Sequence, residues 1–263
     1  MKLSVLTITK NNQDVLSGCL KNAKKHCFEH IIVDDFSTDK TLSIAKQHTS
    51  KVFTHKLTSF AKQRHWAANK ATGDWILFLD SDERITQKGW QEIKQLMQIS
   101  SHSAFRFKRL NYFSGRPIKH GGFWPDYQTR LFNKKTFKGI KGATHEQYLF
   151  DGSLGTLNHA VLHFPDRSIA LGLTKSLIWT KPEAKAFVKA NHPKITWWRL
   201  IKVIVWEFNF RYFKKLGFLD GYIGLVEAIT QAMNKFFIYQ QVWELQNQEK
   251  INTKIKALEK KLL

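Results

Sequence analysis

Two periods of hydrophobic and polar positions follow one another along the first hundred residues. Short apolar runs with the length of buried strands lie at 3–9, 31–33, 52–53 and 75–79. Between them, apolar residues that recur every three to four positions predict amphipathic helices at 14–26, 38–48, 60–71 and 86–97. Strands that alternate with helices predict an α/β fold, with an open, twisted, Rossmann-like parallel sheet and helices on both faces.

The pattern changes after about residue 100. Short β-like pieces separated by glycine-rich loops lie at 104–110, 128–132 and 160–164. From about residue 167 onward, the apolar spacing is that of amphipathic helices. We therefore place a domain boundary near Pro165. It separates a first domain from a C-terminal helical region, and the predicted segments are 1–165, with halves of about 1–100 and 101–165, and 166–263.

Two of the predicted strands end in acids, at Asp34-Asp35 and at Asp80-Ser81-Asp82-Glu83. Burying an unpaired carboxylate is costly, so these groups must cap a helix, bind a cation or accept hydrogen bonds from a ligand. Capping of the next helix by Ser37 or Asp39 explains part of the first cluster but not two successive acids. Ligands of open α/β sheets bind beyond the carboxyl ends of the strands, so we expect both clusters to face one crevice.

The second cluster predicts a metal site. Mg²⁺ and Mn²⁺ prefer oxygen ligands, often one or two carboxylates together with phosphate oxygens. Asp80 and Asp82 are the candidate ligands. His163 is a candidate third ligand, and the alternative for it is a half-buried histidine with a structural hydrogen bond. Phosphatases of the haloacid dehalogenase type also have a strand followed by D-x-D, but Arg84 stands where their motif has Thr or Val.

Three blocks of sequence carry a family resemblance. They are SVLTITKN at 4–11, IIVDDFSTDKT at 31–41 and GDWILFLDSDE at 73–83. In order and spacing they resemble glycosyltransferase family 2, which implies a GT-A fold, a nucleotide-sugar donor and inversion at the sugar. Arg130-Leu-Phe, His145-Glu146 and GFLDGYIGL at 217–225 resemble the branch of lipopolysaccharide-core β-glucosyltransferases.

The resemblance implies a role for each matching residue. Contacts to the nucleotide are implied for Thr7, Thr9, Asn11, Asp34 and Asp35. Contacts to the diphosphate are implied for Arg64 and Asn69. Arg130 is a second candidate donor to the diphosphate, and a structural role is its alternative. Asp80 would contact ribose or the metal, Asp82 would hold the metal, and Glu146 would be the catalytic base with His145 beside it. Many relatives have one acid where Asp34-Asp35 stands, so which of the two reads the base stays open.

These roles predict an inverting, metal-dependent transfer of a hexose. The branch resemblance favours glucose from UDP-glucose as the donor, with Mn²⁺ or Mg²⁺ as cofactor. It favours a lipid-linked saccharide as the acceptor, such as the inner core of lipopolysaccharide or lipooligosaccharide. Another cell-surface polysaccharide is the alternative acceptor. Between residues 102 and 141, ten Lys and Arg residues accompany one acid, which suits a phosphorylated acceptor.

The net charge leaves a second class of function open. The chain has 42 Lys and Arg residues against 21 Asp and Glu residues, a formal charge of +21. Such an excess favours polyanionic partners, and a basic nucleic-acid-binding protein is the alternative to an enzyme. The sequence contains no helix-turn-helix, zinc-finger or RNP pattern, so nucleic acid is not the expected partner. Two cysteines without a metal-binding spacing fit a reducing compartment.

The C-terminal region predicts contact with a membrane surface. Between 194 and 215, Trp and Phe residues are interleaved with Lys and Arg at helical spacing. Packing of this helix on the first domain is the alternative. Apolar spacing at 231–263 suggests packing on the core or a homo-oligomer. Without a recognisable signal peptide or transmembrane segment, we expect a cytoplasmic protein at the periphery of the inner membrane's cytoplasmic face.

Overall fold

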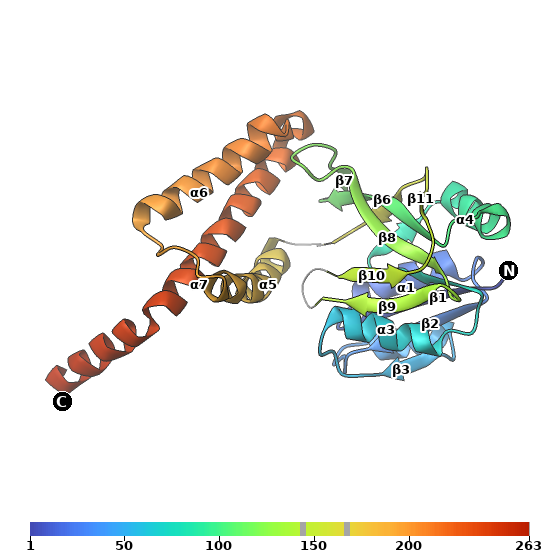
Figure 1. Ribbon diagram of the computed structural model, residues 1–263, viewed down its shortest axis with the longest axis horizontal. Helices are drawn as coiled ribbons and strands as arrows, with labels where there is room; N and C mark the ends of the chain where they lie inside the picture. Colours follow the sequence, from blue (N-terminus) through green and yellow to red (C-terminus); the bar gives the residue numbers. More distant parts are fainter. Residues whose placement is uncertain (143–145, 166–168, 263) are drawn as a thin grey trace. The chain divides into compact units, whose positions relative to one another are not determined.

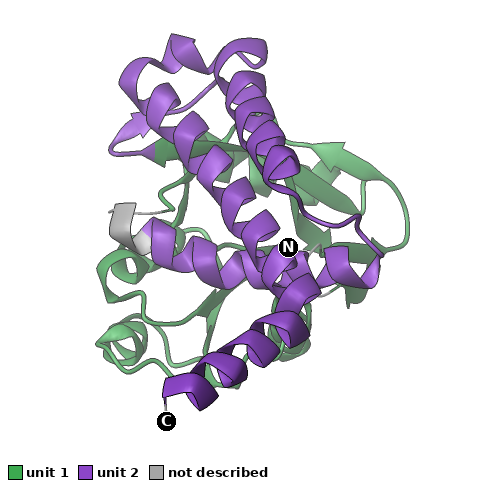
Figure 2. Ribbon diagram, turned by 90° about the vertical axis from the view of Figure 1, so that its left-hand side faces the viewer, with its two compact units in different colours: residues 1–112, 124–165 green, residues 113–123, 166–263 purple. Residues whose placement is uncertain are grey.

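The computed structural model describes residues 1–142, 146–165 and 169–262, which divide into two compact units (Figures 1 and 2). Unit 1 consists of residues 1–112 and 124–165, and unit 2 consists of residues 113–123 and 166–263. The two units therefore separate after Pro165. Residues 113–123 lie in the half-domain 101–165 of the sequence interpretation, and in the structure they belong to the helical unit.

The sheet of unit 1 begins with four neighbouring parallel strands in the order β3-β2-β1-β4. These strands are β1 (Leu3–Thr9), β2 (Glu29–Asp34), β3 (Val52–Thr54) and β4 (Trp75–Phe78). The helices of this part are α1 (Gln13–Ala23), α2 (Thr41–His48), α3 (Phe60–Lys70) and α4 (Gln87–Ile99). The α/β alternation predicted for this part of the chain is confirmed, and the predicted helices end within three residues of the observed ones.

The parallel pairing predicted for the first hundred residues is confirmed, and beyond β4 the sheet is mixed. The order continues β8-β6-β12-β5, and β8 is antiparallel to both of its neighbours. The strands here are β5 (Glu83–Ile85), β6 (Ala104–Phe113), β8 (Asp126–Asn133), β11 (Leu154–Thr156) and β12 (Val161–His163). Parallel neighbours need a long crossover connection, usually a helix. No helix lies between β6 and β8 in the described chain, and these strands pair antiparallel.

Alternate residues of the central strands enter two different apolar clusters, as the two-residue period of a strand requires. Val5 and Leu77 pack with residues of α1 and α4 on one face of the sheet. Leu6 and Ile76 pack on the other face with α3 and with a hairpin. This hairpin consists of β9 (Phe137–Lys141) and β10 (Gln147–Phe150). Helices on both faces are thus confirmed, and the hairpin is an additional cover on the α3 face.

Unit 2 is mainly helical. Its elements are β7 (Arg116–Pro117), α5 (Ile169–Lys189), α6 (Trp197–Asn209), a π-helical turn (Phe210–Lys214), a 3-10 turn (Gly217–Asp220) and α7 (Gly221–Leu262). Asp220 accepts hydrogen bonds from the amides of Lys119 (3.0 Å) and His120 (2.7 Å). A Cβ on residue 224 would lie 1.8 Å from the carbonyl oxygen of Gly217, so only glycine fits there. The GFLDGYIGL motif therefore builds the turn between α6 and α7.

The helices of unit 2 are amphipathic. Across the described residues, none combines the length and the apolar character that a bilayer-spanning helix requires.

Candidate active site

The two acidic clusters lie at the same edge of unit 1, as expected. β1 pairs in parallel with both β2 and β4, and Thr9 at the end of β1 is the register partner of Asp34. The side-chain amide of Asn12 donates to Thr9 Oγ1 (3.2 Å) and to Ser81 Oγ (3.0 Å). Asn12 thus joins the end of β1 to the turn that contains Asp80 and Asp82.

Asp34 and Asp35 have different surroundings. Asp34 is 1% exposed, and its carboxylate accepts from both the amide and the hydroxyl of Ser37, so it closes the turn after β2. Asp35 accepts from the amide of Leu57 (2.9 Å) and pairs with Lys10 (2.7 Å). Burial raises the pKa of Asp35, but these hydrogen bonds outweigh it and hold the pKa below its usual value. The side chain of Lys10 is 57% exposed. A ligand could therefore replace Lys10 as the partner of Asp35 more easily than it could replace Ser37 as the partner of Asp34.

The first sequence block provides three polar residues near this edge, which are Thr7, Thr9 and Asn11. Thr7 is fully buried and donates to the carbonyl oxygen of Leu79 (2.7 Å), so its contact with the nucleotide stays a prediction. Thr9 is 6% exposed. Asn11 is exposed, and its side-chain oxygen accepts from the amide of Thr38 (2.8 Å). Asn11 therefore connects the loops that follow β1 and β2.

Asp80 lies between two buried arginines. Its carboxylate accepts from Arg64 Nη2 (2.6 Å) and from Arg130 Nη2 (3.0 Å). Burial raises the pKa of Asp80, but the charges of Arg130 and Arg64 hold it well below its ordinary value. The side chains of Arg64 and Arg130 are 8% and 6% exposed, so both guanidinium groups are firmly placed. Because Asp80 is already paired with two cations, it is a weaker candidate than Asp82 for a metal ligand.

Glu146, the residue before β10, completes this cluster. One of its oxygens, Oε2, pairs with Arg64 Nη1 and lies 3.4 Å from the hydroxyl of Tyr148. The other oxygen, Oε1, is buried and contacts no hydrogen-bond donor among the described residues. Arg130 donates to the Tyr148 hydroxyl (2.7 Å). The structure thus brings Arg64, Asp80, Arg130 and Glu146 together. His145 lies outside the described residues.

Asp82 forms a second centre with His163. His163 Nδ1 lies 2.6 Å from the amide oxygen of Asn111, and Nε2 lies 3.5 Å from Asp82 Oδ2. An amide oxygen only accepts, so Nδ1 donates to Asn111, and Nε2 faces the carboxylate of Asp82. An imidazole nitrogen and a carboxylate oxygen can both bind a metal ion. Nδ1 held by an oxygen is also the usual support of a metal-binding histidine.

The described residues do not form a complete metal site by protein groups alone. Within the described ranges, no set of three His, Cys, Asp or Glu side chains could hold a metal ion. Asp82 and His163 provide two ligands. Mg²⁺ and similar ions commonly take one or two carboxylates together with substrate phosphates and water. The pair therefore fits a cation whose remaining ligands come from a bound diphosphate.

One predicted site residue faces away from the others. Asn69 is exposed and lies five residues after the buried Arg64 on α3. Five residues of an α-helix rotate the side chain by about 140° from the first position. Asn69 therefore lies on a different side of α3 from Arg64, and the prediction that both residues flank one diphosphate stays a prediction.

Several residues of the site were not identified from the sequence. Tyr148 contacts Arg130, Asn111 orients His163, and Glu83 accepts from the amide of Asp80 (3.0 Å). Burial and the charge of Asp80 raise the pKa of Glu83. Arg109 lies 3.6 Å from Glu83. Only Glu83 had a local signal, because it follows the D-x-D motif directly.

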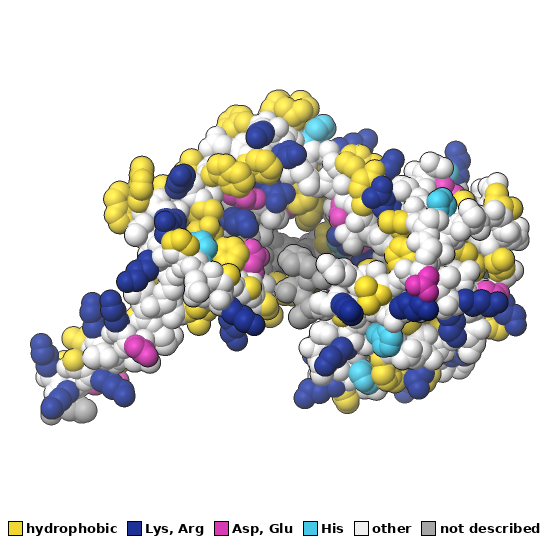
Figure 3. Space-filling model, in the orientation of Figure 1, with side chains coloured by type: hydrophobic (Ala, Val, Ile, Leu, Met, Phe, Trp, Pro, Cys, Tyr) yellow, Lys and Arg dark blue, Asp and Glu magenta, His cyan; other side chains and the backbone are white. Residues whose placement is uncertain are grey.

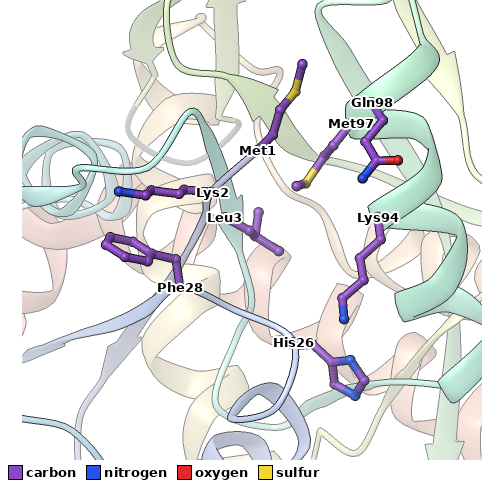
Figure 4. Close-up of a pocket in the computed structure, with 8 residues that line it drawn as sticks. All are labelled: Met1, Lys2, Leu3, His26, Phe28, Lys94, Met97 and Gln98. Atoms are coloured by element: carbon purple, nitrogen blue, oxygen red, sulfur yellow. The ribbon is translucent and has the colours of Figure 1, made fainter.

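A surface pocket at the opposite edge of unit 1 is separate from this site (Figure 4). It is lined by residues 1–3 at the amino end of β1, by His26 and Phe28, and by side chains of α4. None of its lining residues belongs to either acidic cluster. Parallel strands place their amino and carboxyl ends at opposite edges, so the pocket does not contribute to the candidate active site.

The mixed sheet with acids at its carboxyl edge has the arrangement that the resemblance to a GT-A fold implied. The family model "Glycosyl transferase family 2" matches residues 4–151, and the chain belongs to this family. An uncharacterized glycosyltransferase of Rickettsia felis is 30% identical over 251 residues, which cover 89% of this chain and 87% of the relative. Family membership answers the choice between an enzyme and a nucleic-acid-binding protein in favour of the enzyme.

Two further likenesses extend over most of the chain. The lipopolysaccharide core biosynthesis glycosyltransferase LpsC of Rhizobium meliloti is 22% identical over 93% of both chains. The solved structure of Staphylococcus aureus TarS 1-349 in complex with UDP-GlcNAc is 16% identical, with a TM-score of 0.48. It covers 95% of this chain and 92% of that chain.

Proposed function

We propose that this chain is an inverting, metal-dependent hexosyltransferase that uses UDP-glucose and a lipid-linked saccharide acceptor. The observation that carries the proposal is the cluster of Arg64, Arg130, Asp80 and Glu146 beside the Asp82–His163 pair, all within unit 1. Two buried guanidinium groups suit a diphosphate. A buried carboxylate oxygen suits proton abstraction.

Asp82 and His163 are the proposed protein ligands of a divalent cation, Mn²⁺ or Mg²⁺. A cation at this position would act as a Lewis acid and neutralise charge on the leaving nucleoside diphosphate. Asn111 positions the His163 ring by accepting from Nδ1. Asp80 instead orients the two arginines, because both of its oxygens accept from them.

Glu146 is the proposed general base. Its Oε1 would accept the proton of an acceptor hydroxyl as the hydroxyl oxygen attacks the anomeric carbon. The bond from that carbon to the diphosphate breaks on the opposite face, which inverts the configuration. Glu146 and the diphosphate are competing anions for the guanidinium group of Arg64. Donor binding would therefore loosen the hold of Arg64 on the base and leave Glu146 free for the acceptor.

Asp35 is the proposed reader of the nucleotide base. Asp34 is nearly inaccessible and committed to Ser37, whereas Asp35 keeps an exposed partner, Lys10, that a ligand can replace. The uracil N3–H is a donor that a carboxylate of lowered pKa can accept from at neutral pH. These observations support Asp35, the second acid of the pair, as the base contact.

The lipid-linked acceptor rests on different support. LpsC, similar to this chain over 93% of both lengths, is a lipopolysaccharide core biosynthesis enzyme by name. The basic residues of the segment 102–141 suit a phosphorylated saccharide. We propose the inner core of lipopolysaccharide as the acceptor class. Transfer to another cell-surface polysaccharide is the outcome that an acceptor screen would report instead.

Calorimetric binding of UDP, with and without Mn²⁺, tests the donor site. We expect Mn²⁺-dependent binding to the wild type, and binding to Asp82→Asn weaker by at least about tenfold. Asp151→Asn is the matched control, because Asp151 is an exposed acid of unit 1 whose side chain is 69% accessible. Equal Mn²⁺-dependent affinity in the wild type and Asp82→Asn would reject the metal site.

A further inference from the structure

The outer face of α6 has an unusual composition for a helix of a water-soluble surface. Successive residues of an α-helix are rotated by about 100°, so Trp197, Trp198, Ile201 and Val205 lie within a sector of about 100°. We call these four side chains the outer face of α6. They are 72%, 64%, 45% and 52% exposed, respectively. The sector thus carries two tryptophans and two β-branched residues without covering them.

The packed side of the same helix is different. Leu200 contacts an apolar cluster that contains Ile238 and Val242 of α7. Glu207 is buried and pairs with Arg211 (2.7 Å). The tryptophans of α6 are therefore not the residues that attach the helix to unit 2. Packing within unit 2 leaves the exposure of the outer face unexplained.

Positive charge borders this face. Lys202 and Arg199 lie beyond one end of this sector, at about 140° and 200° from Trp197. Residues 194–215 contain six Lys and Arg residues and one acid, the buried Glu207. Lys214 and Lys215 follow at the end of the helix, and both are exposed. The accessible charge of residues 194–215 is therefore entirely positive.

Apolar exposure continues at the turn between α6 and α7. The exposed apolar side chains here are Phe213, Leu216, Phe218, Leu219 and Tyr222, each between 43% and 75% accessible. Figure 3 shows hydrophobic side chains gathered over α6 and over this turn, with Lys and Arg side chains among them. Ordinary protein surfaces expose single, scattered apolar residues, whereas here several exposed apolar side chains lie together.

We propose that the outer face of α6 binds the surface of an anionic lipid bilayer. Interfacial helices place Trp and aliphatic side chains at the boundary between headgroups and acyl chains, and their Lys and Arg residues at lipid phosphates. A second copy of the chain fits less well, because it would bring the same positive charges face to face. A phosphate-bearing surface complements both the apolar sector and its basic border. The proposal is independent of the donor and acceptor assigned above.

Co-flotation with lipid vesicles tests this binding. The full chain carrying Asp82→Asn is mixed with vesicles of phosphatidylcholine and phosphatidylglycerol at 7:3, and with vesicles of phosphatidylcholine alone. We expect strong binding to the mixed vesicles that weakens at high salt, and at least tenfold weaker binding to the neutral ones. Asp82→Asn removes a proposed metal ligand, so this variant is expected not to transfer sugar. Its binding to vesicles is therefore measured without a contribution from the reaction.

Two pairs of variants locate the binding surface. Trp197→Ala with Trp198→Ala should lower the vesicle partition coefficient by at least tenfold, whereas Phe28→Ala, at an exposed aromatic of unit 1, should leave it unchanged. Lys202→Gln with Lys214→Gln should lower it several-fold. The charge-matched control is Lys24→Gln with Lys88→Gln, both exposed in unit 1.

Three outcomes would overturn the proposal. The first is equal binding to neutral and anionic vesicles. The second is unchanged binding by the double tryptophan variant, whose folding is checked by circular dichroism. The third is absence of vesicle binding together with a dimer in analytical ultracentrifugation that the tryptophan variant dissociates. That last result would assign the outer face to self-association.

Discussion

The two edges of the sheet in unit 1 each hold a glutamate, buried at the amino edge and half-buried at the carboxyl edge, and the two glutamates differ in how completely they are hydrogen-bonded. At the amino edge, Glu29 accepts from Ser4, from Lys51 and from the amide (2.6 Å) and hydroxyl (3.0 Å) of Thr72. At the carboxyl edge, Glu146 has one oxygen on Arg64 and one buried oxygen that contacts no donor among the described residues.

This difference distinguishes a structural acid from a reactive one. A buried carboxylate with every oxygen satisfied joins segments of the chain, and Glu29 connects β1, β2 and the approach to β4 in this way. A buried oxygen without a donor costs stability and is retained where chemistry needs it. We therefore expect changes at Glu29 to affect stability and changes at Glu146 to affect turnover.

The largest expected effect is on turnover in Glu146→Gln. An amide of the same shape cannot accept the acceptor's proton, so kcat should fall roughly 1,000-fold, within the range that general bases contribute. Affinity for UDP and Mn²⁺ should change little, because Arg64 keeps its partner Asp80. Transfer is measured with a radiolabelled donor, and binding by calorimetry. Near-normal turnover in this variant would remove Glu146 from the role of base.

The next effect is on stability at Glu29. Burial raises the pKa of Glu29, but its hydrogen bonds from Lys51, Ser4 and Thr72 outweigh this and lower the pKa from 4.5 to about 2. A shift of this size corresponds to about 3 kcal/mol of folding stability. Because the folded pKa is the lower one, this contribution is complete above pH 4.5 and is lost as the pH falls towards 2.

Urea unfolding at several pH values measures this contribution. Glu29→Gln should lower the free energy of unfolding at pH 7 and should flatten its fall between pH 4.5 and 2. The kcat of the folded variant should match that of the wild type. A variant as stable as the wild type at pH 7 would contradict the structural role of the amino-edge network.

A smaller effect is expected at Asn111, which positions His163 without reaching the proposed cation. Loss of such a support typically weakens metal affinity about tenfold or more, so Asn111→Ala should raise the Mn²⁺ concentration needed for half-maximal activity by about that factor. The kcat at saturating Mn²⁺ should be nearly unchanged. Asn111→Asp should restore affinity, because its carboxylate can also accept from Nδ1. A fall in kcat without a change in Mn²⁺ dependence would indicate a purely structural role.

Local patterns in the sequence predict the parallel half of unit 1 and its acids. The apolar run that forms β4 (Trp75–Phe78) and the acids that follow it are contiguous in sequence, so their meeting at one edge follows from strand and helix alternation. His163 and Asn111 are different, because they are 52 residues apart and meet through the parallel register of β6 and β12. Register between distant strands depends on tertiary pairing, which a single sequence does not display.

The same limit explains the hairpin that carries Tyr148. Tyr148 packs against Phe132 of β8 in a stacked arrangement, with ring centroids 5.0 Å apart, and from there it reaches Arg130. The segment around it has no clear apolar period, so its sequence predicts a loop.

The exposure of Trp197 and Trp198 is a different case. The apolar side of an amphipathic helix usually packs against the protein, whereas these two tryptophans are exposed. Their spacing predicted a helix, and only the structure shows which side is covered.

The smallest expected effect is at Asn69, where the family resemblance and the geometry of α3 lead to different expectations. The family resemblance places Asn69 at the diphosphate, whereas α3 turns it about 140° away from Arg64 and leaves it exposed. Asn69→Ala should therefore change the calorimetric affinity for UDP with Mn²⁺ by less than about twofold, as expected for an exposed side chain outside the site. Arg64→Lys is the comparison on the same helix. It should weaken binding clearly, because one ammonium cannot replace a guanidinium that contacts two carboxylates. If Asn69→Ala weakens UDP binding as much as Arg64→Lys does, both residues contact the donor, and the contrast between the two sides of α3 is wrong.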